Sequence, residues 1–237
     1  MNQAEEIIKL LEQQRNEEQR KVLMRFFKTG KGQYGEGDEF LGLTVPQTRL
    51  IVKATKHSLS LDEIEKLLYS RWHEARLCGL LLLVEEMKKA KKNPVRREEI
   101  AEFYLRHVRQ ANNWDLVDLS CQYILGPYLL PTENYDILYR LADSDNLWEQ
   151  RIAIVSTLYL IRAGIFTPTL TIAEELLSHK HDLIHKATGW ALREVGKRDA
   201  DTLRNFLANH YSYLPRTTLR YAIERLDAAE CQYWLKL

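Results

Sequence analysis

Trp114 and Asp118 are the residues of this sequence whose types and spacing are best suited to chemistry. They stand four positions apart, so a helix over this segment places them on one face and within reach of each other. Asn112 is predicted to cap that helix, and Asp115, three residues later, to close its start much as in a capping box. An indole excludes water and a carboxylate stabilises a cation. The pair therefore predicts a cation-stabilising site, if it faces solvent and not the core.

Residues of the C-terminal half could complete this site. Trp190 follows Gly189 on a later predicted helix, and Arg193 lies three residues further on. Projected from successive helices, aromatic, carboxylate and arginine side chains would line one groove. Arg151 is also a candidate partner for Asp118, because a carboxylate beside a core tryptophan has to be paired. A purely structural ion pair between these two residues is thus the alternative to a functional site.

The remaining motifs favour no cofactor and no metal. The three glycines of residues 30–35 fit a dinucleotide-binding pattern, but that motif needs a preceding strand, and here a helix precedes it. A flexible loop is the better prediction. His179 and His181 are interpreted as solvated residues at a helix end. Residues 88–97 hold six basic and no acidic side chains, which predicts either a solvated helix end or a phosphate contact.

Composition places the chain among ordinary water-soluble proteins. Of its 237 residues, 45% are apolar and 28% charged, and the formal net charge of +1 alone predicts no polyanion partner. No apolar run is long enough to span a bilayer, and the polar N-terminus is not a secretory signal. Three widely spaced cysteines indicate reduced thiols rather than a disulfide or zinc framework. We therefore expect a cytoplasmic protein without membrane contact.

Apolar periodicity predicts helices nearly throughout, and no strand. The expected helical regions are 3–28, 46–56, 61–70, 72–91, 95–108, 113–125, 131–142, 146–163, 168–178, 182–196, 200–210 and 215–227. Trp72, Trp114 and Trp148 each follow a capping residue by two positions, at spacings of 42 and 34. Such a period predicts an all-α, superhelical α-solenoid of HEAT-like repeats, forming one domain over 1–237. Trp72 and Trp148 are then structural repeat residues.

Three ordered segments resemble the bacterial DNA alkylation-repair glycosylases built from HEAT-like repeats, the AlkD family. They are Trp-Asp-Leu-Val-Asp at 114–118, Ser-Asp-Asn-Leu-Trp-Glu-Gln-Arg at 144–151, and the segment 186–194 with its Gly-Trp pair. Their order and spacing agree with that family over about 85 residues, and a looser match extends over the chain. Three segments in order are far more specific than any one of them.

The resemblance implies a DNA N-glycosylase that removes positively charged alkylated purines from double-stranded DNA, without capturing the base in a pocket. By position, Trp114 and Trp190 would pack on the deoxyribose of the lesion. Asp118 would stabilise the oxocarbenium ion and place the attacking water. Arg151 would hold a backbone phosphate, and we expect Lys186 and Arg193 to contact phosphates as well. Such a substrate is already a good leaving group, so charge stabilisation is the main catalytic task.

One departure from the family concerns an aromatic residue that carries a hydroxyl near the end of the first long helix pair. Phe26 stands in the matching segment and has no hydroxyl, while Tyr34 follows in the glycine-rich insertion. This departure bears on the substrate range and rate that the resemblance implies for this chain more than on the fold it implies.

We expect a monomer. The alternative function is a non-catalytic HEAT-repeat scaffold that binds nucleic acid or a protein.

Overall fold

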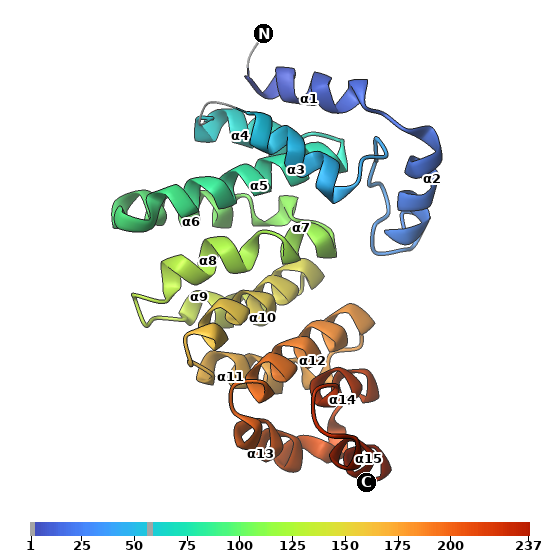
Figure 1. The fold of residues 1–237 in the computed structure, drawn as a ribbon, viewed down its shortest axis with the longest axis vertical. Helices are drawn as coiled ribbons and strands as arrows, with labels where there is room; N and C mark the ends of the chain where they lie inside the picture. The colour runs from blue at the N-terminus through green and yellow to red at the C-terminus, as the bar shows by residue number, and fades with distance from the viewer. Residues whose placement is uncertain (1–2, 56–58) are drawn as a thin grey trace. The chain divides into compact units, whose positions relative to one another are not determined.

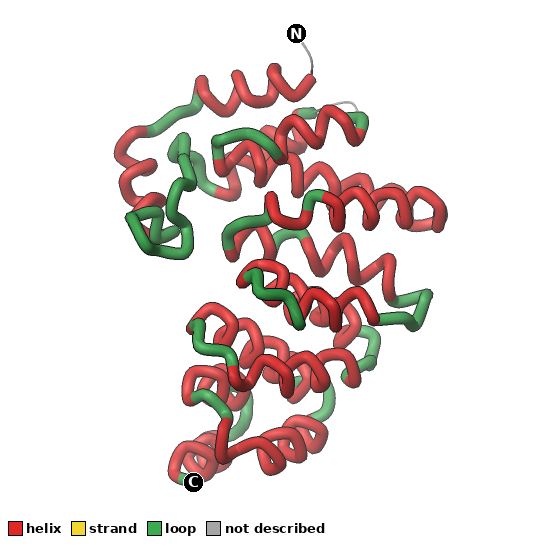
Figure 2. Tube along the Cα trace, turned by 180° about the vertical axis from the view of Figure 1, so that it is seen from behind, coloured by secondary structure: helices red, strands yellow, loops and turns green. Residues whose placement is uncertain are grey.

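The computed structural model describes residues 3–55 and 59–237, and helices make up most of them (Figures 1 and 2). Within these residues no strand forms, and the only β-type pairing is an isolated bridge between Glu39 and Trp72. The all-α prediction is therefore confirmed for this part of the chain. The described residues contain no helix long and apolar enough to cross a membrane.

The chain divides into two compact units, Met1–Ser120 and Cys121–Leu237. Each unit has its own helices and its own buried core. The prediction that residues 1–237 form one HEAT-like solenoid stays a prediction.

Helix α5 is the centre of the first unit, because its side chains are buried from His73 through Val84. It packs against α3, α4, α6 and α7, and α1 packs against α3, α4 and α5 (Figure 1). The helices of this unit are α1 (Gln3–Gln13), α2 (Glu17–Phe26), α3 (Val45–Ala54), α4 (Leu61–Leu68), α5 (His73–Lys89), α6 (Pro94–Arg106) and α7 (Trp114–Asp118). Single 3₁₀ turns follow α5 and α6, at Ala90–Lys92 and Val108–Gln110.

Helices α10 and α12 hold the second unit together. Helix α10 packs against α8, α9, α11 and α12, and α12 packs in turn against α13 and α14. The close approach of α12 and α14 depends on Gly189, because a Cβ there would clash with Tyr221 and with the Thr218 carbonyl. The helices are α8 (Cys121–Leu129), α9 (Asp136–Ala142), α10 (Leu147–Arg162), α11 (Thr167–Glu175), α12 (Asp182–Gly196), α13 (Ala200–His210), α14 (Arg216–Ile223) and α15 (Ala228–Lys236), with 3₁₀ turns at Leu176–Ser178 and Tyr211–Tyr213.

The helices differ from the prediction in several places, among them α9, which begins at Asp136 and not at 131, and α14, which ends at Ile223 and not at 227. The region 3–28 is two helices, because the Asn16 side chain accepts the amides of Glu18 and Gln19 and starts a new helix. The region 113–125 is also two, broken between α7 and α8. Helix α15 was not predicted, although Asp227 caps it.

The long segment between α2 and α3, drawn as loop in Figure 2, is bound in its second half by Glu74 of α5. The buried Glu74 carboxylate accepts the backbone amides of Leu41, Gly42 and Leu43 at 2.9, 2.8 and 3.1 Å. Gly42 has a φ of 96°, a conformation that favours glycine. The second half of this segment is therefore fixed to α5, whereas the flexible loop expected for residues 30–35 stays a prediction.

Candidate functional site

Helix α7, which carries Trp114 and Asp118, is capped by Asn113 and not by Asn112 as predicted. The Asn113 Oδ1 atom accepts the amide of Trp114 at 2.9 Å, and Asn113 is fully buried, whereas Asn112 is exposed. With two adjacent asparagines, the sequence alone does not select the capping residue. The shift of one position leaves Trp114 and Asp118 as the first and last residues of α7.

Asp115 has a different partner from the one predicted. Its Oδ1 atom accepts the next amide, that of Leu116, at 2.8 Å, so it does not close a capping box. Its Oδ2 atom lies 2.9 Å from Nε2 of His73 on α5. Both side chains are buried. Asp115 therefore ties the start of α7 to α5.

His73 lies between two carboxylates in a buried polar cluster. Its Nδ1 atom is 2.7 Å from Asp38 Oδ2, and Asp38 is also paired with the Arg76 guanidinium. Burial alone lowers the pKa of His73, but Asp115 and Asp38 outweigh it and raise the pKa to about 9. Burial raises the pKa of Asp38, but His73 and Arg76 more than offset it and hold that pKa below its ordinary value. His73 and Asp38 are thus both charged at neutral pH.

The protonation of His73 predicts how stability depends on pH. Because its pKa is raised from 6.5 to about 9, its contribution to the free energy of unfolding is complete below about pH 6.5 and lost as the pH rises through about 9. The contribution is on the order of 3 kcal/mol. We expect the melting temperature of the protein to fall between about pH 7 and 9.5, as measured by calorimetry at constant ionic strength. A level melting temperature across that window would contradict the assignment.

Aromatic rings continue from His73 to Trp114. The His73 ring stacks on Phe40 with centroids 4.3 Å apart, and Phe27 stacks on both Phe40 and Trp114 at 5.1 Å. Phe26 meets the edge of Trp114 at 5.7 Å and is 59% exposed. The Trp114 indole is therefore held against α2 and the loop that follows it.

Trp114 and Asp118 share a cavity of about 400 Å³ within the first unit. Its walls are mostly apolar and come from α2, the loop, α3, α5 and α7. The lining residues are Leu23, Phe26, Phe27, Phe40, Leu43, Thr44, Val45, Pro46, His73, Glu74, Leu77, Trp114, Asp115, Asp118 and Leu119. Trp114 and Asp118 thus line one cavity, while their action as a cation-stabilising pair stays a prediction. An apolar wall around a carboxylate strengthens its attraction for a cation.

In the second unit, Arg151 is 5% exposed and reaches the start of α12. Its guanidinium donates to the Leu183 carbonyl at 2.5 Å. His181, predicted to be solvated, is half-buried and caps α12, because its Nδ1 atom accepts the Leu183 amide at 3.2 Å. Burial, with the nearby His185 and Arg151, lowers the pKa of His181 although Asp182 opposes this. His179 is half-buried, and its ring accepts the amide of His181 at 2.9 Å.

The other predicted residues of the second unit lie on α12. Lys186 pairs with Asp182 one helical turn earlier, at 2.7 Å. Arg193 pairs with Glu224, the residue that follows α14. Trp190 is half-buried and stands between these two cations in the sequence. Lys186 and Arg193 must therefore exchange a carboxylate for a phosphate if they bind DNA. Pairing of Asp118 in one unit with Arg151 in the other stays a prediction.

The remaining sequence motifs are engaged in burial or ion pairs within the fold. Trp72 and Trp148 are buried, as predicted for repeat tryptophans. In the basic run 88–97, Lys88, Lys89 and Arg96 each pair with a glutamate.

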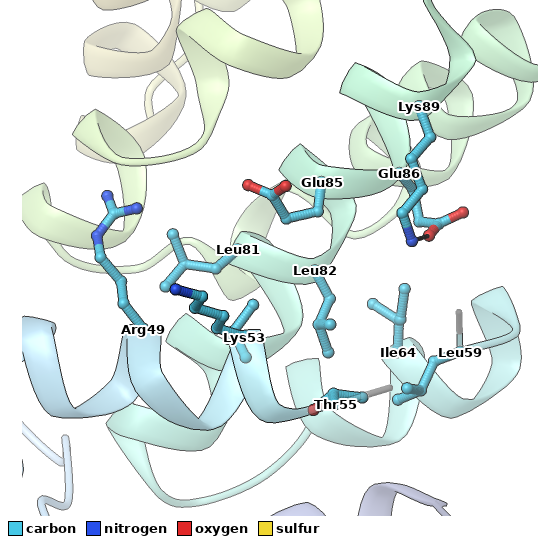
Figure 3. A pocket seen from close by; sticks show the side chains of 11 residues that line it. Arg49, Lys53, Thr55, Leu59, Ile64, Leu81, Leu82, Glu85, Glu86 and Lys89 are labelled. Carbon is cyan, nitrogen blue, oxygen red and sulfur yellow. Dashed lines mark hydrogen bonds and ion pairs between the residues drawn. The ribbon is translucent and has the colours of Figure 1, made fainter. Parts of the chain in front are cut away.

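A second cavity of about 400 Å³, between α3, α4 and α5, has a rim of mixed charge that includes the Glu86–Lys89 ion pair (Figure 3). It contains none of the predicted site residues. Among the residues placed in the structure, no group of three or more His, Cys, Asp or Glu could hold a metal ion.

Comparison with known proteins decides the family. A family model described as DNA alkylation repair enzyme matches residues 7–226. The chain belongs to the DNA alkylation repair enzyme family. A solved structure from Enterococcus faecalis, described as a predicted DNA alkylation repair enzyme, has a TM-score of 0.67 and 17% identity, and the match covers 91% of this chain and 98% of that one. At this identity the likeness shows the fold alone. No curated protein matches the sequence.

Membership of the DNA alkylation repair enzyme family confirms the resemblance drawn from the three segments. The structure adds His73 and Asp38, which sequence reasoning missed. Asp38 follows the glycines and His73 opens a helix, and neither position shows that the two residues meet. Phe26 lacks the hydroxyl of the family's aromatic residue, but Tyr34 lies next to it. The Tyr34 hydroxyl donates to the Phe26 backbone carbonyl at 3.5 Å.

Proposed function

We propose that this member of the DNA alkylation repair enzyme family is an N-glycosylase that releases positively charged alkylated purines from double-stranded DNA. The observation that supports it most is the cavity shared by Trp114 and Asp118, in a chain whose family repairs alkylated DNA. Asp118 stabilises the oxocarbenium ion that forms as the base leaves, and directs water to it. Trp114 packs on the deoxyribose and excludes other water, and the same role for Trp190 remains what the resemblance implies.

The substrate explains why a single carboxylate suffices. A purine alkylated at N3 or N7 already carries a positive charge, so it leaves without protonation by the enzyme. The barrier then depends on the positive charge that develops on the sugar. A carboxylate in an apolar cavity lowers that barrier, because preorganised electrostatic stabilisation is usually the largest catalytic term. Gripping the leaving base in a pocket is not required by this mechanism.

The test of this function is release of base from DNA. Duplex DNA methylated at purine N3 and N7 is incubated with the protein, and the released bases are separated and quantified. We expect release of methylated purines and none of normal bases. If no base is released while the protein binds the DNA, the glycosylase proposal fails.

Arg151, Lys186 and Arg193 are proposed to hold backbone phosphates. We expect Lys186→Gln and Arg193→Gln each to weaken binding about equally on all sequences, and each to reduce the slope of log affinity against log salt by about 1. Fluorescence anisotropy at several salt concentrations measures both effects. The matched control is Lys236→Gln, which removes a charge near the end of α15. If Lys186→Gln and Arg193→Gln leave the salt slope unchanged, these residues do not contact phosphate.

A non-catalytic scaffold that binds nucleic acid or a protein is the second candidate function. The ion pairs that already engage Lys186 and Arg193 favour it, because they give both cations a structural role. Phe26, without the family's hydroxyl, favours it too. A scaffold binds DNA or a protein partner and releases no base, so the base-release assay separates the two functions.

A further inference from the structure

Helix α7 carries Trp114 and Asp118 but is only five residues long. A helix of this length is not stable through its own hydrogen bonds. Contacts outside the helix must therefore fix its position. Two of the side chains that make such contacts stand at its start, Asn113 and Asp115, on either side of Trp114.

Both of these side chains lead to the same buried cluster. Asn113 Nδ2 donates to Asp38 Oδ2 at 3.3 Å, and Asp115 Oδ2 is 2.9 Å from His73 Nε2. The opposite ring nitrogen of His73 is 2.7 Å from Asp38. An imidazole with a carboxylate at each nitrogen donates to both only when it is an imidazolium. A single charged ring thus joins the loop that carries Asp38 to the start of α7.

Packing provides a second route from the same ring to the site. The rings of His73, Phe40, Phe27 and Trp114 form a continuous series of contacts, with centroids 4.3 to 5.1 Å apart. His73, Trp114 and Asp118 also line the same cavity. A change at His73 therefore reaches the indole through the ring stack as well as through Asp115.

We propose that His73 is a positioning residue, whose imidazolium sets where α7 begins and so where the Trp114 indole and the Asp118 carboxylate stand in the cavity. Its consequence for base release rests on the proposed function. The positioning of α7 by His73 does not rest on that function, because it concerns only where α7 lies. His73 takes no part in bond making or breaking.

The charged groups around His73 determine how the start of α7 responds to pH. Asp38 comes from the loop, Asp115 from α7, and Glu74 and Arg76 from α5, while Asp118 lines the same cavity. Arg76 remains paired with Asp38, and Glu74 remains bound to three loop amides, when His73 loses its proton. Asp115 then loses the cation that holds it. The start of α7 should therefore loosen on the alkaline side, near the His73 pKa of about 9.

The first experiment observes Trp114 in the protein without DNA. Its indole N–H signal in a ¹H–¹⁵N spectrum is identified as the one missing in Trp114→Phe. We expect this signal to shift with an apparent pKa of about 9, while the signals of Trp148 and Trp234, both in the second unit, stay in place. A Trp114 signal that does not move between pH 7 and 10 would overturn the proposal.

Two variants and a control test the cause. Asp38→Asn removes one carboxylate from His73, so we expect the midpoint of the Trp114 shift to move to lower pH. His73→Asn removes the titrating group and should abolish the shift. His107→Asn, a histidine of the same unit that contacts Tyr69, should leave the midpoint unchanged. An unchanged midpoint in Asp38→Asn also overturns the proposal, even if His73→Asn fails to fold.

Base release at pH 7.5 gives the functional readout. Displacement of a catalytic group by about 1 Å can cost about a hundredfold, so we expect His73→Asn to slow release at least about tenfold with little change in DNA affinity. A folded His73→Asn with wild-type release and an unmoved Trp114 signal contradicts positioning and leaves the glycosylase function intact. A wild-type protein without base release contradicts the glycosylase function, and the indole titration still decides the positioning.

Discussion

Replacing Asp118 with asparagine is expected to slow base release from methylated DNA by about a hundredfold or more, the scale for losing one preorganised electrostatic contact. Asparagine keeps the shape of the side chain and removes the charge that stabilises the sugar cation. DNA affinity should stay the same or rise, because a negative charge leaves a site that faces phosphates. Single-turnover release and anisotropy measure the two effects.

Asp62→Asn is the matched control for Asp118→Asn, since Asp62 is an exposed carboxylate on α4 of the same unit. It should change neither release nor melting temperature. A stable Asp118→Asn protein that releases base at the wild-type rate would remove Asp118 from the mechanism. A scaffold protein would instead have no release to lose, and a structural Asp118 would show itself as a lower melting temperature.

The largest effect on stability is expected for Asp38→Ala. This change leaves Arg76 and His73 buried without the carboxylate that lies between them. Breaking a buried pair by removing one partner costs about 3–5 kcal/mol, because the remaining charge is uncompensated. Urea unfolding of the variant and the wild type at pH 7 measures the difference in the free energy of unfolding.

Glu36→Ala is the control for Asp38→Ala, because Glu36 is an exposed acid of the same loop whose carboxylate accepts a loop amide. It should change the free energy of unfolding by less than about 1 kcal/mol. If Asp38→Ala is no less stable than Glu36→Ala, the buried cluster does not support the fold. Base release should fall with Asp38→Ala as well, since Asp38 also binds Asn113 at the start of α7.

The sequence was sufficient to predict features that depend on local spacing. Trp114 and Asp118 line one cavity because four residues make about one helical turn. The burial of Trp72 and Trp148 followed from their repeated position. In each case the residues concerned lie within one helix or at its start.

Features that join distant segments were not predictable from one sequence. His73 and Asp115 are 42 positions apart, and Asp38 and His73 are 35 apart. Their meeting depends on how the loop and α7 pack on α5, which no periodicity encodes. Asp115 looked like a capping residue because its local pattern fits one. A buried histidine offered a stronger partner.

The three loop amides bound by Glu74 have a consequence for local opening of the fold. Loop amides usually exchange their hydrogens with solvent within the dead time of a measurement. Those of Leu41, Gly42 and Leu43 are instead hydrogen-bonded to a buried carboxylate. They exchange only when the loop leaves α5, and that opening also exposes Asp38 and frees the start of α7. The loop and α7 thus belong to one cooperative unit. Lesion DNA that orders the cavity would slow exchange at these amides, so the loop can report substrate binding on wild-type protein.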